Sequence, residues 1–204
     1  MDITSLRSFT NLQTKFMFLA KLEPIADLDF KNFTILARST SILGKRRNKV
    51  DYKFLGRQMS IPVGIAHDGS WNVTMILDEG VSEYQKFVKW FYYIDNIKKL
   101  DNEGMNADFK TNGLIKLMKL DGKSTNTVYA LLGCYIGNLP NLDGLSHDDN
   151  SGHITFTANL YIDDVAHGVV DDGGNIKWLE SDDDIYYPYK DELLAYTNIS
   201  TAFG

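Results

Sequence analysis

The sequence lacks most of the residue patterns that reveal chemistry. It holds a single cysteine, Cys134, among 204 residues, so an internal disulfide and a cysteine-rich metal site are both excluded. This cysteine usage suits a reducing compartment. No apolar run is long enough to cross a bilayer, and the first residues lack the basic and then apolar order of a signal peptide. We therefore expect a soluble protein that does not enter a membrane and is not secreted by the general pathway.

Catalytic motifs are also missing. Gly44 and Lys45 are followed by Arg46 instead of Ser or Thr, so this stretch is not a phosphate-binding loop. The stretch around Ser146 lacks the second glycine of a nucleophile elbow, and none of the four histidines belongs to a helical His-Glu-x-x-His pair. We therefore expect no enzyme activity, no catalytic residue, no cofactor and no metal. An enzyme or ligand-binding domain whose site follows no known motif stays open as an alternative.

Charge is divided unevenly along the chain, whose formal net charge is -6. Residues 1–142 hold 19 Lys and Arg against 14 Asp and Glu, a net charge of +5, whereas residues 143–204 hold 2 against 13, a net charge of -11. Two acidic clusters, Asp143 to Asp149 and Asp182 to Asp184, offer the oxygen ligands that calcium prefers, but neither has the Asp-x-Asx-x-Asx-Gly spacing. A solvated acidic surface is therefore favoured over a calcium site.

One short basic cluster stands out in the first part of the chain. It consists of Lys45, Arg46, Arg47 and Lys49, with Asn48 between them. A nucleic-acid grip needs a basic stripe, because affinity comes largely from neutralising phosphates. Five residues make a short stripe, so the favoured interpretation is a solvated hairpin tip, followed by contact with an acidic protein surface and then by DNA binding.

Hydrophobic periodicity predicts a mainly β protein with one helix, an α+β fold. Trp71, Val73 and Met75 alternate with smaller or polar residues, which is typical of a half-buried strand. The run from Ile154 to Ile162 alternates in the same way. Further strands are predicted on each side of the basic cluster and at Lys15 to Leu22, Phe33 to Ala37, Leu114 to Leu120 and Val128 to Tyr135.

The one predicted helix follows an acidic turn at Asp78 and Glu79. Four large residues fall at positions i, i+3, i+4 and i+7 and so share a helix face: Tyr84, Phe87, Val88 and Phe91. Ser82 and Gln85 have the spacing of a capping box. The aromatic density of this stretch would also suit a stacking surface for a ligand, but the helical spacing favours a core that packs against the sheet.

Four phrases, taken in order, carry a resemblance to a known family. They are Phe54 to Val63, Trp71 to Met75, Tyr84 to Trp90 and Ile154 to Leu160. In that order and at that spacing, the chain from Ala37 to Asp164 resembles the tail tube proteins of contractile-tailed bacteriophages. No single phrase is specific, and the resemblance rests on their order.

The resemblance implies a fold and an assembly. The expected fold is an antiparallel β-barrel or sandwich of the phage tail tube type, shared with type VI secretion tube proteins, with one flanking helix and a long projecting hairpin. The expected assembly is a stack of hexameric rings that forms a hollow conduit for DNA inside a contractile sheath. The inter-ring hairpin would be Thr40 to Ile61, with the basic cluster near its tip, and the tube-lining strands would come from Phe33 to Val63 and from Leu114 to Tyr135.

The resemblance also implies partners and a place of action. The expected partners are further copies of the chain, the tail sheath protein, the baseplate hub and tail-terminator proteins, and the tape measure protein and DNA in the lumen, without sequence-specific binding. A conduit for DNA should have an acidic or neutral wall, since a basic wall would hold phosphates. The expected location is the virion tail, assembled in the bacterial host cytoplasm. A baseplate tube initiator, a tail-terminator ring and the tube of a related contractile injection system are the alternatives.

The same comparison divides the chain into three parts. Residues 1–13 are expected to form an N-terminal arm, residues 14–164 the tail-tube β-barrel domain, and residues 165–204 an acidic extension packed on the tube. Ile176, Trp178 and Leu179 make that extension too apolar for a free tail. An added hairpin or short helix is therefore expected there.

Overall fold

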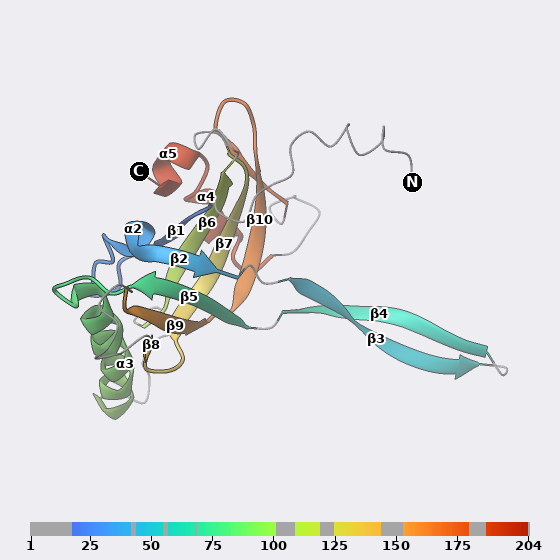
Figure 1. Cartoon of the computed structure of the whole chain (residues 1–204). Helices are drawn as coiled ribbons and strands as arrows, with labels where there is room; N and C mark the ends of the chain where they lie inside the picture. The colour runs from blue at the N-terminus through green and yellow to red at the C-terminus, as the bar shows by residue number, and fades with distance from the viewer. Residues whose placement is uncertain are drawn as a thin grey trace, which may run out of the picture. The chain divides into compact units, whose positions relative to one another are not determined.

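The structure is a computed structural model, shown in Figure 1. It describes residues 18–41, 44–54, 57–67, 69–100, 109–118, 125–143, 153–179 and 187–203. The expected N-terminal arm lies outside the described residues, as do the acidic clusters apart from Asp143.

Strands dominate the described part of the chain. They are β1 (Phe18–Leu22), β2 (Ala37–Thr40), β3 (Lys45–Phe54), β4 (Arg57–His67), β5 (Ser70–Ile76), β6 (Thr111–Met118), β7 (Thr125–Ile136), β8 (Asn141–Asp143), β9 (Thr155–Tyr161), β10 (Asp164–Val170) and β11 (Ile176–Trp178). The helices are α2 (Phe33–Leu36), α3 (Ser82–Leu100), α4 (Lys190–Leu194) and α5 (Ile199–Phe203). Most of the predicted strands are present within a few residues of their predicted bounds.

The strands belong to two sheets. In the nine-stranded sheet the hydrogen-bonded order is β1-β6-β7-β9-β5-β2, with β10 paired to β7 and β11, and β8 paired to β9. Strands β3 and β4 form a separate two-stranded sheet. The pairs with a resolved register are antiparallel. The predicted fold class, mainly β with antiparallel pairing, is therefore confirmed.

By its contacts the chain divides into two compact units. The larger unit holds the described residues within 20–114 and 130–166, and the smaller holds those within 115–129 and 167–203 together with the start of β1. Strand β10 begins at Asp164 and contributes residues to both units. The boundary expected between residues 164 and 165 therefore falls at the start of a strand of the main sheet.

The core of the larger unit lies on one face of β5 and β9. Strict alternation sends every second side chain of each strand to that face. The fully buried members are Trp71, Val73, Met75, Phe156, Ala158 and Leu160. The two strands run antiparallel with Val73 opposite Ala158, so their apolar positions coincide across the pair. The alternation predicted from the sequence is thus the packing pattern of the structure.

Helix α3 packs its aromatic side chains on this core. The ring of Phe87, which is fully buried, lies 6.0 Å from that of Phe156 and 5.0 Å from that of Phe30, centroid to centroid. The indole Nε1 of Trp90 donates a hydrogen bond of 3.0 Å to the carbonyl oxygen of Phe109. The ring of Phe87 therefore packs within the core, and the polar atom of Trp90 is satisfied.

The prediction of a strand from Phe33 to Ala37 is wrong for its first four residues, which form the short helix α2. The carbonyl oxygen of Asn32 accepts hydrogen bonds from the amides of both Ile35 and Leu36. Phe33 is fully buried, with its ring 5.8 Å from that of Trp71. A single helical turn places that ring in the core, so packing outweighs the β preference of the apolar run.

The smaller unit contains the predicted extra hairpin and two helices. Strands β10 and β11 pair antiparallel, with Gly168 opposite Trp178. The indole Nε1 of Trp178 donates to the carbonyl oxygen of Tyr196 at 2.9 Å, and Leu193 of α4 is fully buried. The acidic end of the chain is therefore folded around apolar residues of its own.

Candidate assembly surface

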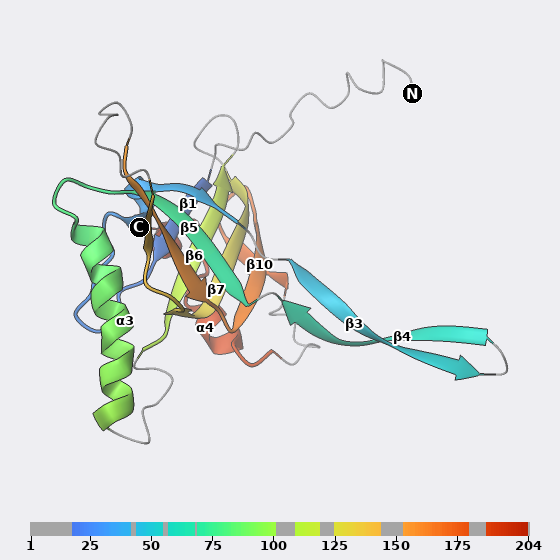
Figure 2. The same cartoon turned by 60° about the horizontal axis from the view of Figure 1, so that its bottom comes forward.

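The β3–β4 hairpin is the candidate site that the resemblance singles out. The two strands pair antiparallel from Lys45 opposite His67 to Phe54 opposite Arg57. The register shifts between Arg47 and Asn48, where β4 carries one extra residue. Figures 1 and 2 both show a long two-stranded ribbon. All side chains described on it from Asn48 outward are exposed, so the ribbon has solvent on both faces.

The basic cluster lies at the base of this hairpin, which corrects the prediction that places it near the tip. Lys45, Arg46 and Arg47 are the first residues of β3, and the strand continues five residues beyond Lys49 to Phe54. The prediction failed because it took the charged run itself as the turn. The apolar residues that follow alternate with polar ones, which is the pattern of a continuing strand.

Lys45 anchors the hairpin base to the first residue of β10. Its Nζ atom lies 3.1 Å from Oδ1 of Asp164, and the two side chains are only 18% and 20% exposed. A partly buried ion pair is screened less by salt than a surface pair. Lys45 therefore has a structural contact within its own chain.

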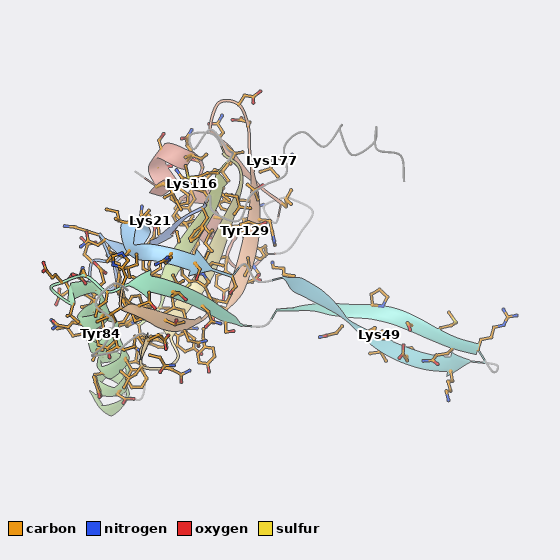
Figure 3. All side chains as sticks on the ribbon, viewed as in Figure 1. Lys21, Lys49, Tyr84, Lys116, Tyr129 and Lys177 are labelled. Carbon is orange, nitrogen blue, oxygen red and sulfur yellow. The ribbon has the colours of Figure 1, made fainter. Side chains whose placement is uncertain are left out.

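One face of the hairpin is polar. The cross-strand pair Asp51 and Ser60 lies on it, and the Ser60 hydroxyl donates a hydrogen bond to the Asp51 carboxylate. Lys49, labelled in Figure 3, adds an ion pair of 3.5 Å between its Nζ and Oδ2 of Asp51. Lys53 and Gln58 form the next pair on this face. Water can hydrogen-bond to the polar groups of such a face, so the face needs no protein partner.

The opposite face of the hairpin is apolar. Val50 lies opposite Ile61 and Tyr52 opposite Met59, so alternation places all four side chains together. They are 39%, 46%, 53% and 55% exposed, respectively. Contiguous exposed apolar side chains on an edge element are typical of an interaction surface. We call these four residues the apolar hairpin face.

The second group of predicted site residues lies on α3, and only one of the four is fully buried. Phe87 is fully buried, whereas Tyr84, Val88 and Phe91 are half-buried. The buried line of the helix instead comprises Glu83, Phe87, Trp90 and Ile94, which also keep helical spacing. The core-facing stripe is thus rotated from the predicted one, and the sequence concealed it because one member is a glutamate.

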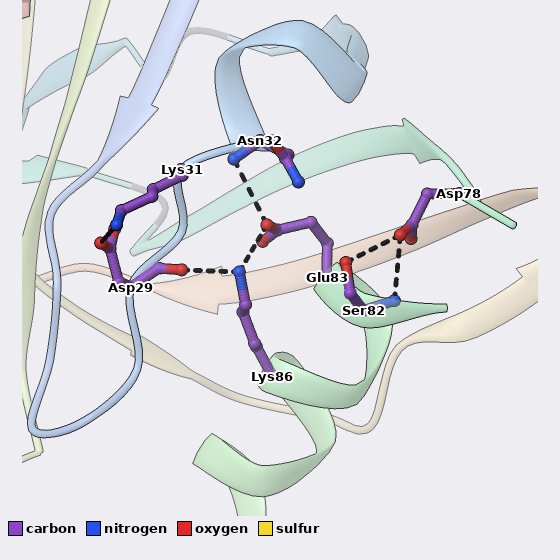
Figure 4. A network of polar contacts seen from close by, with 7 residues as sticks. All are labelled: Asp29, Lys31, Asn32, Asp78, Ser82, Glu83 and Lys86. Atoms are coloured by element: carbon purple, nitrogen blue, oxygen red, sulfur yellow. Dashed lines mark hydrogen bonds and ion pairs between the residues drawn. The ribbon is translucent and has the colours of Figure 1, made fainter. Parts of the chain in front are cut away.

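A polar network explains the buried glutamate. Figure 4 shows Oε1 of Glu83 accepting hydrogen bonds from Nζ of Lys86 at 2.7 Å and from the amide of Asn32 at 3.3 Å. The same lysine donates to the carbonyl oxygen of Asp29 at 2.6 Å. Pairing and hydrogen bonding make a buried carboxylate tolerable. The network therefore fastens the segment before α2 to the first turn of α3.

The start of α3 also differs from the predicted capping box. The hydroxyl and the amide of Ser82 both donate to Oδ2 of Asp78, at 2.7 and 3.2 Å, so Asp78 caps the helix from four residues upstream. Burial tends to raise the pKa of the Asp78 carboxyl. The hydrogen bonds from the Ser82 hydroxyl and amide outweigh burial, so the pKa lies below its ordinary value of 3.8.

Replacing Asp78 with alanine is expected to destabilise the subunit by about 0.5–2 kcal/mol, because a helix cap is lost. The carboxyl has a lower pKa in the folded state, so it contributes fully above its unfolded pKa and loses that contribution as the pH falls through the folded pKa. The difference in urea stability between wild type and Asp78→Ala should therefore shrink below pH 3.8. The exposed neighbour Glu79 provides the control, and a Glu79→Ala variant with the same loss would contradict the assignment.

Two further features of the described residues bear on function. No helix among them has both the length and the apolar character needed to cross a membrane. Within the same residues, no three His, Cys, Asp or Glu side chains are grouped so that they could hold a metal ion.

The fold is that of tube components of contractile injection systems. The structure superposes on a chain of the sheath–tube complex of an extracellular contractile injection system, PVC, with a TM-score of 0.54 and 14% identity over 83% of this chain and 100% of that chain. It superposes equally on a chain of the anti-feeding prophage tube-terminating cap, with a TM-score of 0.55 and 12% identity over the same shares. No protein-family model matches the chain.

Sequence comparison extends this likeness to particular proteins. The chain is homologous to tail tube protein gp19 of Enterobacteria phage T4, with 25% identity over 133 residues, which cover 65% of this chain and 80% of the phage protein. The tail tube protein gp19 of Enterobacteria phage T6 matches to the same extent. Together with the fold, this homology supports a structural role in a tube or a related assembly.

Proposed function

We propose that this protein is the tail tube subunit of a contractile phage tail and that it has no catalytic activity. Its rings, six-fold by analogy with the family, would stack into a hollow conduit inside the sheath. The observation that carries the proposal is the homology to the T4 tail tube protein, combined with a hairpin whose apolar face is exposed in the single chain. In a polymer, a neighbouring copy of the chain would bury this apolar hairpin face.

The topology offers two further contacts for a ring. Strand β2 ends the main path of the sheet, and β8 pairs with β9 alone, so each has one side without a strand partner among the described strands. Unpaired strand edges readily accept another strand. Pairing of β2 with β8 of a second copy would be a heterologous contact, and such contacts close into a ring when the rotation permits.

In this proposal the hairpin of each subunit contacts a subunit of the adjacent ring. The sheath surrounds the tube, and the baseplate and terminator proteins contact the two ends of the tube. The tape measure protein and DNA would occupy the lumen without sequence-specific binding. Assembly would take place in the cytoplasm of the bacterial host.

A single-ring component of the tail is the second candidate. The likeness to a chain of a tube-terminating cap, with a TM-score of 0.55, favours it specifically. A terminator or initiator must present one ring face that does not add another ring. The two candidates therefore differ in whether the rings stack.

Negative-stain electron microscopy of the purified protein over a concentration series tests the proposal. We expect hollow rods of uniform width and variable length. Isolated rings that never stack, even with a preformed tube end as a nucleus, would favour the terminator or initiator. Monomers that stay monomeric with that nucleus would contradict both.

A further inference from the structure

The two strands proposed for the ring contact carry opposite charges. Strand β2 includes Arg38, strand β8 ends at Asp143, and both residues are exposed. Neither residue belongs to an ion pair between described residues. A charged side chain on an edge strand hinders indiscriminate strand addition. Each edge therefore favours a second strand that brings the opposite charge.

Arg38 also occupies an irregular position on β2. The register pairs Ala37 with Met75 and Ser39 with Thr74, so Arg38 is an extra residue with no opposite residue on β5. A bulge of this kind bends an edge strand and re-aims its side chains. Bulges and charges both keep an edge strand from joining other strands at random, and β2 has both at one residue.

The strands β8, β9, β5 and β2 alternate in direction. Each neighbouring pair is antiparallel, and Figure 1 shows β2, β5 and β9 side by side. When copies share one orientation around a ring axis, β2 of one copy and β8 of the next also meet antiparallel. The alternation of strand direction thus continues from copy to copy without a reversed strand.

A row of paired residues indicates where the two charges meet. One such row crosses the four strands through Asn141, Thr157, Thr74 and Ser39. If the row continues into the next copy, Ser39 lies opposite Asn141. Arg38 is then one residue and Asp143 two residues from that row, on the same side of it. The remaining offset of about 3.4 Å along the strands is within the reach of an arginine side chain.

We infer that an ion pair between Arg38 of one copy and Asp143 of the next selects the ring contact. The inference rests on the proposed function and names the residues that decide which edges join. Pairing two β2 strands would place Arg38 beside a second Arg38, and like charges across a strand pair are destabilising. Pairing two β8 strands would bring no cation to Asp143. The charges therefore favour the heterologous contact that closes a ring over a symmetric dimer.

The short length of both strands makes a side-chain determinant necessary. Strand β2 has 4 residues and β8 has 3, so the contact between them forms few backbone hydrogen bonds. Backbone groups are the same on every strand edge, so they do not distinguish one edge from another. Complementary charges provide that distinction, because they exclude wrong pairings and fix the register of the right one.

Charge reversal with rescue tests the inference. Arg38→Glu and Asp143→Arg each place like charges at the contact, and each should raise the protein concentration needed for tube formation by about tenfold or more. The variant with both substitutions restores the ion pair in reverse and should assemble near the wild-type threshold. Sedimentation of polymer over a concentration series, with a preformed tube end as a nucleus, measures the thresholds. Circular dichroism checks that each variant is folded.

Lys177→Glu provides the control for net charge. Lys177 is exposed and lies on β11, outside both strands of the contact. Its substitution changes the net charge by the same amount as Arg38→Glu does, and the variant should assemble as the wild type does. An equal loss in this control would mean that net charge decides assembly, and the inference would be overturned.

Two further results would overturn the inference and leave the proposed function intact. They are folded single variants that assemble as the wild type does, and a folded double variant that is as impaired as the single ones. Failure of the wild-type protein to form tubes with a preformed nucleus would overturn the proposed function and the inference with it.

A cysteine pair replaces the test if a charge-reversal variant fails to fold. The variant with Arg38→Cys and Asp143→Cys is oxidised in the presence of a preformed tube end. Cys134 is fully buried and burial raises the pKa of its thiol, so it does not compete. Covalent multimers on a denaturing gel would support the contact. Monomers alone, from tubes that have formed, would overturn it.

Discussion

Replacing Tyr52 and Met59 with serine should raise the protein concentration needed for tube formation at least tenfold and leave the subunit folded. The two side chains are 53% and 55% exposed, so they add little to the stability of a single chain. Burial of an apolar side chain contributes about 1.5–3 kcal/mol, and 1.4 kcal/mol is a factor of ten in affinity. Sedimentation of polymer over a concentration series measures the threshold.

The hairpin provides its own control for this experiment. Lys53 and Gln58 form the next cross-strand pair, on the polar face. A Lys53→Ser and Gln58→Ser variant changes the same number of side chains one residue further along each strand, and it should polymerise nearly as the wild type does. Equal loss in both variants would mean that the hairpin acts through its length or rigidity, and the apolar face would lose its assigned role.

The second large effect is expected for Phe87→Ala, which should destabilise the subunit by about 3–5 kcal/mol. The ring is fully buried and lies near those of Phe30, Phe33 and Phe156, so its loss leaves a cavity that these rings cannot easily fill. Urea unfolding followed by tryptophan fluorescence measures the change. Tyr92→Ala, on the exposed side of the same helix at 53% exposure, should cost far less. A decrease in the free energy of unfolding of less than about 1 kcal/mol for Phe87→Ala would show that packing of α3 through Phe87 contributes little to the stability of the core.

Prediction of secondary structure and burial from the sequence was most accurate where a single hydrophobic period runs through a whole strand or helix. The strands at Ser70–Ile76 and Thr155–Tyr161 alternate cleanly because one face is core and the other is not. Prediction failed where a tertiary contact selects the local structure. Phe33 begins a helical turn instead of a strand, and this turn brings its ring against that of Trp71. Glu83 lies in the buried line of α3, where Lys86 pairs with its carboxylate. Lys86 lies only three residues from Glu83 on the same helix. The other partner of Glu83, the amide of Asn32, is 51 residues away, and Trp71 is likewise far from Phe33 in the sequence, so these two contacts could not be weighed in advance.

The candidate site was predictable in its location and not in its chemistry. The resemblance indicated a hairpin in this stretch, and the charged run drew attention to Lys45 and its neighbours. The structure instead places Lys45 in an ion pair with Asp164, more than a hundred residues later in the chain. The alternation of Val50 and Tyr52 was visible in the sequence, but its meaning depends on the register with Met59 and Ile61.

The hairpin's regular register makes its length adjustable. Its two faces repeat every second residue, and each residue adds about 3.4 Å, so inserting two residues in each strand lengthens the ribbon by about 7 Å and keeps both faces where they are. Inserting one residue in each strand instead moves every side chain beyond the insertion to the opposite face of the hairpin. The extra residue opposite Arg47 and Asn48 breaks the ladder near the base, so changes beyond it need not disturb the main sheet. If the hairpin joins neighbouring subunits as proposed, the distance it bridges can therefore evolve in steps of about two residues per strand while the core stays unchanged.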